Sequence, residues 1–446
     1  MVAVLVALVV AVGAVGVTLT VTGGTTAPIG GPPRPQPQTA TIGLMAPVSG
    51  DLASVGGAVR NAVRLAVDEA NADGAIPGWK IRVSVQDDLS RPDGGARAAG
   101  ALAADDTVIG VVGPLSSTVA MVALPTLSAA GIAVVSPSNS SPDLTDLPEP
   151  TDRATATSRG RPYPEYFRLS GTDVLAARTS AEYAVVTMGR RRIAVIDGGP
   201  DFGTSLAERF AAEASRLGAT ITGIHTVHGS SDDSSEVSAV VSWLQADAPD
   251  LLYVATGFAF AAHLRNELAD QGLAVAVLGS DGLFDPRYPE RTRGAAEGDV
   301  VTDLGAPVSE LPQAGSFAAA YLHRWGGRNG NRDAGTTRDD ASVATDGPNR
   351  VTSPSTSPDT SGIPPVAAYA YDAATALLRA ARRVLPGRTR VDGATRAAIV
   401  AALGQGRFAG ATGEVGFDAW GDAVAPLVTV YAVRNRTFVP VAVRRR

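Results

Sequence analysis

Small hydroxyl residues follow two apolar runs of the sequence, in each case just before a helix-like segment. Residues 108–112 lead into the serine and threonine residues 116–118, and residues 133–135 lead into a second turn at 136–142. In an open parallel α/β sheet, ligands bind outside the carboxyl ends of the strands, where such turns gather. Helix N-termini add unpaired N–H groups and a partial positive charge there. The two turns therefore predict a pocket for a small carboxylate, and nothing near them is suited to breaking a bond.

Groups that catalyse reactions are sparse in this chain. It contains no cysteine, which excludes a thiolate nucleophile and cysteine-bound metals, and Lys80 is its one lysine, which disfavours Schiff-base chemistry. No Gly-x-Ser-x-Gly, Gly-x-Gly-x-x-Gly or His-Glu-x-x-His pattern occurs. We therefore predict that the protein is not an enzyme and has no catalytic residue, cofactor or metal site. The four histidines are scattered, at His225, His228, His263 and His323.

Length and charge narrow the possible classes further. A chain of 446 residues is long for one hydrophobic core and indicates two or more domains. Its net charge of −6 argues against nucleic acid as a partner, because a phosphate-binding surface needs clustered positive charge.

Hydrophobic periodicity alternates between strand-like and helix-like segments from residue 41 onward. Strand-like runs such as 41–45 and 275–278 are separated by helix-like ones such as 119–130, which is typical of parallel βαβ units. A polar stretch at 142–164 interrupts this alternation, which then restarts. The sequence therefore predicts an α/β protein with two doubly wound parallel-sheet lobes.

The first segment and one late segment depart from this pattern. Residues 1–22 contain no charged side chain and are long and apolar enough to span a bilayer, and a Pro/Gly/Thr-rich linker follows at 23–39. Because a cleaved signal peptide normally begins with charged residues, we favour an uncleaved membrane anchor over a signal segment. Residues 326–365 contain too few apolar side chains to pack, which predicts a disordered surface insertion.

The two serine turns resemble those of the leucine/isoleucine/valine-binding proteins of ABC importers. These are type I periplasmic binding proteins, which have two lobes and a hinge. The resemblance extends well beyond the turns, and its strings occur in the family's order along the chain. They are residues 41–56, 61–74, 86–88, 279–282, 295–298, 370–374 and 412–418.

This resemblance implies how the chain is divided. Lobe 1 would join residues 40–168 to residues 303–414, and lobe 2 would join residues 169–302 to residues 415–446. The chain would cross a three-segment hinge, which is the arrangement that lets two rigid lobes close over a ligand.

The resemblance also assigns roles within the serine turns. Ser117, with Ser116 next, would bind a ligand carboxylate through its hydroxyl. Ser138 would offer its backbone carbonyl to a ligand ammonium, and the hydroxyl of Ser140 would serve both ends of the ligand. Without the resemblance, the serines before residue 119 would read as helix caps. The register of each turn is open by one residue.

On lobe 2, the family places an acidic residue at Asp281, where it would pair with the α-ammonium of the ligand. Taken alone, this residue would read as an ordinary turn aspartate. Phe202 lies where amino-acid binders often have a tyrosine, and it would keep an apolar wall without the hydroxyl. Phe258 is a further candidate for that wall, and Val55 replaces another common aromatic residue.

Together, these features predict an extracytoplasmic solute-binding protein of an ABC importer, anchored to the membrane by residues 1–22. Its partners would be a permease, an ATPase and a small polar ligand, with a branched-chain or other amino acid as the first choice. Two alternatives stay open. One is a membrane-tethered sensor of the same fold, and the other is an importer protein for an amide, urea or aromatic acid.

Overall fold

The structure is a computed structural model, and part of the chain lies outside what it describes. The predicted anchor 1–22, nearly all of the linker 23–39 and most of the insertion 326–365 fall outside it. No helix in the described ranges is long and apolar enough to cross a bilayer. The described residues are 37–148, 159–199, 203–227, 234–326, 360 and 362–445.

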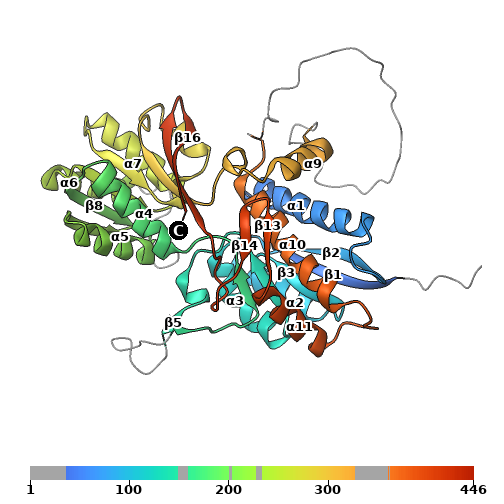
Figure 1. Ribbon diagram of the computed structural model, residues 1–446. Coiled ribbons are helices and arrows are strands. Elements are labelled where there is room, and N and C mark those ends of the chain that lie inside the picture. Colours follow the sequence, from blue (N-terminus) through green and yellow to red (C-terminus); the bar gives the residue numbers. More distant parts are fainter. Residues whose placement is uncertain are drawn as a thin grey trace, which may run out of the picture. The chain divides into compact units, whose positions relative to one another are not determined.

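The first of two large sheets has five parallel strands in the order β2-β1-β3-β4-β7, of which β1, β2 and β3 are labelled in Figure 1. All residues of β3 and β4 are buried, as expected for central strands of a parallel sheet that is covered on both faces. The strands are β1 (Gln38–Ala46), β2 (Trp79–Asp87), β3 (Val108–Val112), β4 (Ala133–Ser136) and β7 (Tyr166–Arg168).

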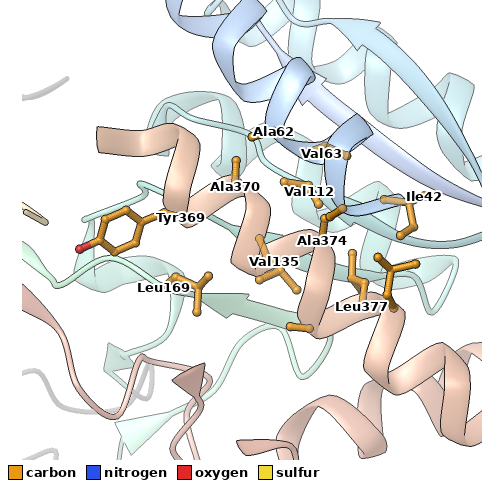
Figure 2. Close-up of a cluster of buried hydrophobic side chains, with 14 of the residues drawn as sticks. Ile42, Ala62, Val63, Val112, Val135, Leu169, Tyr369, Ala370, Ala374 and Leu377 are labelled. Atoms are coloured by element: carbon orange, nitrogen blue, oxygen red, sulfur yellow. The ribbon is translucent and has the colours of Figure 1, made fainter. Parts of the chain in front are cut away.

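Helices pack on both faces of this sheet. On one face, α1 (Ala53–Ala72) and α10 (Pro365–Val384) bury apolar side chains against β1, β3 and β4. Figure 2 shows Ala370 and Ala374 of α10 beside Val112 and Val135, and such small side chains allow the helix to approach the strands closely. The opposite face carries α2 (Pro92–Ala103) and α3 (Ser117–Ala129). Further helices in this part of the chain are α9 (Gly315–Trp325) and α11 (Gly393–Gly404).

The second sheet has seven strands in the order β16-β15-β12-β11-β10-β8-β9. Strands β8 to β12 are parallel, whereas β15 and β16 add an antiparallel hairpin at one edge. The strands are β8 (Arg192–Asp197), β9 (Thr220–Thr226), β10 (Leu251–Ala255), β11 (Ala276–Gly279), β12 (Val300–Leu304), β15 (Leu427–Arg434) and β16 (Thr437–Arg445).

Both faces of the second sheet are also covered by helices. One face carries α4 (Asp173–Glu182), which continues into a π-helical turn at Tyr183–Thr187, and α5 (Thr204–Arg216). The other carries α6 (Ser234–Asp247) and α7 (Phe258–Asp270). The remaining elements are α8 (Arg287–Arg291), 3₁₀ turns at Pro142–Leu144, Asp281–Leu283 and Val308–Glu310, and short pairs β5–β6 (Leu147–Pro148, Arg159–Gly160) and β13–β14 (Arg407–Gly410, Gly413–Gly416).

The sheets confirm the predicted fold class, and the chain passes between them three times. It goes from β7 to α4, from β12 back to α9, and from β14 to β15. The residue boundaries given above for the two lobes stay a prediction. Helix α3 begins at Ser117, two residues earlier than expected, because the serine turn itself forms the first turn of that helix. The strand expected at 275–278 is shifted by one residue.

Two strings of the family resemblance meet at one buried carboxylate, Asp372 in α10. Its oxygens accept hydrogen bonds from the backbone N–H of Ala411 at 2.9 Å and of Thr412 at 2.7 Å, and from the hydroxyl of Thr412 at 2.6 Å. A Cβ atom at Gly410 would lie 2.5 Å from the carboxylate, so only glycine fits there. Burial raises the pKa of Asp372, while these hydrogen bonds act to lower it. The carboxylate therefore fixes the β13–β14 hairpin to α10.

Replacing Asp372 by alanine is expected to lower the free energy of unfolding by about 2–4 kcal/mol, because buried N–H groups would lose a charged acceptor. Denaturant unfolding of the two proteins measures this change. Asp270→Ala serves as the control, since Asp270 forms an ion pair with Arg293 in which both side chains are largely exposed, and such pairs contribute about 0–1 kcal/mol. Equal losses in the two variants would contradict the structural role of Asp372.

Candidate functional site

The two serine turns lie side by side because β3 and β4 are adjacent parallel strands, so their carboxyl ends meet at one edge. Hydrogen bonds join the turns directly. The backbone N–H groups of Ser140 and Ser141 both donate to Oγ of Ser117, each at 3.2 Å. The hydroxyl of Ser138 donates to the carbonyl of Leu115 at 3.0 Å. The predicted residues of both turns are thus brought together in one hydrogen-bonded unit.

Hydrogen-bond capacity separates the roles of the serine hydroxyls. Because Oγ of Ser117 already accepts two N–H groups, it has one O–H left to donate and no free lone pair. That hydroxyl can bind an acceptor, such as a carboxylate oxygen, but not a ligand N–H. The hydroxyl of Ser116 pairs with that of Thr118 at 2.8 Å, and the hydroxyl of Ser138 is engaged by Leu115. Ser117 is therefore the better candidate of the first turn.

Ser140 faces an acidic side chain. Its carbonyl accepts the backbone N–H of Asp173 at 2.9 Å, at the point where the chain enters α4. Burial raises the pKa of the Asp173 carboxyl, and a hydrogen bond from Ser140 acts to lower it. A hydroxyl that donates to a carboxylate keeps lone pairs with which to accept from an ammonium. Ser140 thus suits the nitrogen end of a zwitterion better than its carboxylate end.

Hydrogen bonds from buried polar side chains fix the second serine turn in place. Asn139 is fully buried; its amide donates to the carbonyl of Leu115 at 2.8 Å and accepts from the hydroxyl of Tyr166 at 3.1 Å. The hydroxyl of Ser136 donates to the carbonyl of Pro114 at 2.9 Å and accepts from the N–H of Asn139 at 3.0 Å. These bonds fix the path of the turn, and they give Asn139 a structural role.

Arg168, at the end of β7, was not predicted as a site residue. Its side chain is fully buried. Its guanidinium donates to the carbonyl of Ser141 at 2.6 Å, to the hydroxyl of Thr145 at 2.5 Å and to the carboxylate of Asp422 at 2.7 Å. The only sequence feature that could have identified it is a positive charge at the end of the strand-like run Tyr-Phe-Arg. Arg168 is a positioning residue, because it ties the second serine turn to the C-terminal part of the chain.

The loop after β1 also reaches this edge of the sheet. Gly113 has φ of +100°, and a Cβ atom there would lie 2.1 Å from the carbonyl oxygen of Met45, so the close approach requires glycine. Asp87 accepts the N–H of Val48 at 3.1 Å and is bonded by the hydroxyl of Ser49. Burial raises the pKa of Asp87, but these hydrogen bonds outweigh it and lower the pKa. Asp87 is thus structural.

Asp281 is the first residue of the 3₁₀ turn that follows β11. Burial and, secondly, the charge of Asp173 raise its pKa to about 7. No ion pair within the described ranges involves Asp281, so a ligand cation could supply its counter-charge. Because Asp173 contacts Ser140 and also acts on Asp281, it links the second serine turn with this carboxyl group.

The apolar wall is only partly described. Phe202 lies outside the described residues, so its predicted role is still a prediction. Phe258 begins α7, and the guanidinium of Arg287 lies 4.3 Å from the centre of its ring. Val55 is in the first turn of α1. Among the described residues, no group of three or more His, Cys, Asp or Glu side chains could hold a metal ion.

Two α/β sheets, three chain crossings and hydroxyl turns at strand ends define a type I periplasmic binding protein fold. A family model described as periplasmic binding protein matches residues 39–436, and the chain belongs to that family. The Leu/Ile/Val-binding protein homolog 3 of Brucella melitensis is 29% identical over 320 residues, which cover 68% of this chain and 82% of that protein. The Leu/Ile/Val-binding protein BraC3 of Rhizobium johnstonii is 28% identical over 263 residues, or 59% and 67% of the two chains.

Solved structures agree with this fold. The leucine binding protein LivK of Thermotoga maritima has a TM-score of 0.68 at 21% identity, covering 91% of this chain and 98% of that one. LivJ of Streptococcus pneumoniae, in complex with isoleucine, has a TM-score of 0.67 at 21% identity, covering 92% and 100%. The predicted resemblance is confirmed, and the homologues are solute-binding proteins of transporters rather than enzymes.

Proposed function

We propose that this protein captures a free amino acid outside the cytoplasm and delivers it to the permease and ATPase of an ABC importer. The strongest support comes from two side chains, Ser117 and Asp281, which need ligand groups of opposite charge. Ser117 has only a donor to offer, which suits a carboxylate, whereas Asp281 is a carboxyl group without a counter-cation among the described residues. A zwitterion satisfies both needs at once.

The relatives support the same class of ligand. The curated proteins named above carry Leu/Ile/Val-binding names, and the LivJ complex contains isoleucine. A structure of the same fold from Rhodopseudomonas palustris contains 3,4-dihydroxybenzoic acid, at 18% identity and a TM-score of 0.65. A ligand with a carboxylate and no ammonium would leave Asp281 uncompensated, so we favour the amino acid. We also propose that the two lobes, with the residue boundaries predicted from the sequence, close over the bound ligand.

A ligand screen on the full chain tests this proposal. Thermal unfolding is followed with amino acids, amides, urea and aromatic acids at matched concentrations. An amino acid at a hundredfold excess over its dissociation constant should raise the free energy of unfolding by about 2.7 kcal/mol, because it binds the native state alone. Stabilisation by another solute class, with no amino acid effective, would reject the assignment.

We further propose that residues 1–22 anchor the protein to the membrane. The full chain should then fractionate with membranes, and a variant lacking residues 1–22 should be recovered in the soluble fraction and still bind ligand. N-terminal sequencing checks the alternative directly: a mature chain that begins near Thr25 or Ala27 would show that the segment is cleaved.

A further inference from the structure

A second acidic side chain, Asp303, lies beside Asp281 at the same edge of the second sheet. Strands β11 and β12 are parallel neighbours, and Gly279 pairs with Val301. Asp281 and Asp303 each follow these paired residues by two positions, so both emerge at the carboxyl ends of adjacent strands. Their charges interact, and Asp173 at the start of α4 acts on Asp281 as well.

No cation within the described part of the chain forms an ion pair with Asp281 or Asp303. Among the described residues, the positive groups that act on the acidic cluster of Asp173, Asp281 and Asp303 are Arg168 and Arg209. Both act on Asp173, and Arg168 forms an ion pair with Asp422. The other described titratable groups that interact with this acidic cluster are acidic or neutral. They are Tyr253 near Asp281 and Asp173, Tyr369 and Tyr431 near Asp303, and, behind these, Asp143, Glu310 and Asp372.

Buried hydroxyls around the two carboxyls are also unpartnered. Tyr369 is 4% exposed, Tyr431 is 2% exposed and Ser280 is 1% exposed, and no hydrogen bond of ordinary geometry reaches their hydroxyl oxygens within the described part of the chain. The backbone of Ala306 acts on the hydroxyl of Tyr369, and the side chain of Thr429 acts on that of Tyr431, whereas no such group among the described residues acts on Ser280. In Figure 2, the hydroxyl of Tyr369 points away from the apolar side chains of α10 and the first sheet. The charge of Asp303 acts on both tyrosines. Buried polar groups without partners are costly, and this set points to a polar occupant.

The nature of that occupant follows from the groups present. The described residues hold no set of side chains that could bind a metal ion, which leaves an organic cation with N–H donors. A single ammonium would pair with one carboxylate, while the other carboxyl, which is partly buried, would keep its proton and form no ion pair. Because a charge-assisted hydrogen bond is stronger than a neutral one, a ligand with two cationic groups, one for each carboxylate, matches the pair better.

We propose that Asp303 is a second acidic residue of the ligand site, and that Asp281 and Asp303 together select an amino acid whose side chain carries a second cationic nitrogen group. This inference rests on the proposed amino-acid function and narrows its ligand to the basic class. Selectivity over neutral amino acids then comes from the second ion pair, which only a cationic side chain can form.

The acidity of the pair adds a pH signature. Burial, and then the charge of Asp281, raises the pKa of Asp303 to about 8, and burial with Asp173 raises that of Asp281 to about 7. The free protein therefore holds protons on these carboxyls near neutral pH. A cationic ligand binds the ionised forms and expels those protons. Its affinity should rise about tenfold or more from pH 6 to pH 8.5, through both pKa values.

Calorimetry on the full chain at pH 8 tests the inference with matched ligands. L-arginine and L-lysine supply the second cation, whereas L-citrulline has nearly the shape of arginine without its charge, and L-leucine is neutral and apolar. At least one basic amino acid should bind about tenfold or more tightly than either neutral ligand. Asp303→Asn should abolish this preference and leave citrulline nearly unchanged. Asp270→Asn, an exposed change of the same charge, should keep the preference.

The outcomes separate the inference from the proposed function. If leucine or citrulline binds the wild type as tightly as the basic ligands, the inference is overturned while the amino-acid function stands. If no amino acid binds, both fall. The comparison of ligands and the pH profile need only the wild type, so they decide the matter even if Asp303→Asn does not fold.

Discussion

Replacing Arg168 by methionine is expected to lower the free energy of unfolding by about 3–5 kcal/mol, the usual cost of removing one partner of a buried ion pair. Methionine keeps much of the side-chain volume but none of the donors. The carbonyl of Ser141 and the hydroxyl of Thr145 would lose their bonds, and Asp422 would lose its bond to the guanidinium. Denaturant unfolding at pH 7 measures the loss.

The matched control is Arg178→Met, because Arg178 and Glu182 form an i,i+4 pair on the surface of α4. That change should alter the free energy of unfolding by about 0.5 kcal/mol or less. Arg168→Met should also weaken ligand binding, since Ser140 lies in the turn that Arg168 holds. A variant that unfolds like the control would show that the network around the turn does not depend on this guanidinium.

Replacing Asp281 by alanine should weaken the binding of an amino acid by about tenfold to a hundredfold. A charged hydrogen bond in a buried site contributes about 1.5–3 kcal/mol, and the substitution removes it. The fold should survive, because the carboxyl group makes no ion pair within the described ranges and its burial opposes its ionised form. The comparison is made by calorimetry at pH 8, above the raised pKa of Asp281.

The desamino analogue of the same amino acid provides the control for this prediction. It should bind the wild type poorly and lose little further affinity in Asp281→Ala, since the group that Asp281 recognises is already missing. Equal affinity of the amino acid and its desamino analogue for the wild type would refute the zwitterion arrangement.

The sequence predicted the parts of the fold that depend on local patterns. Strand β3 was predicted with its observed ends, and both serine turns were identified. Each is marked by a continuous apolar run followed by hydroxyl residues and a helix, a pattern that can be recognised within about a dozen residues. Their proximity could also be inferred, since successive strands of a parallel sheet are usually neighbours. Confirmation that Ser117 bonds to the second turn required coordinates, because the register of each turn was open by one residue.

Residues that act over long separations in the chain were missed. Arg168 lies in a strand of three residues, too short to give an alternating pattern, and its ion-pair partner Asp422 is far away in the sequence. Asp303 was missed for the same reason, because it lies next to last in the short strand β12 and no motif surrounds it. The hairpin β13–β14 is short and rich in glycine, and it is held in place by Asp372 from a distant helix.

The two bonds that Ser117 receives from the second turn have an evolutionary consequence. Its hydroxyl is needed by the backbone of another loop, whatever the ligand, so a substitution there removes scaffold and recognition together. Among the described residues, Asp281 and Asp303 of the proposed site make no such bonds between loops and can change independently of the scaffold. If the proposed site is correct, descendants of this protein would acquire new ligands by changes at Asp281 and Asp303, while Ser117 is inherited unaltered.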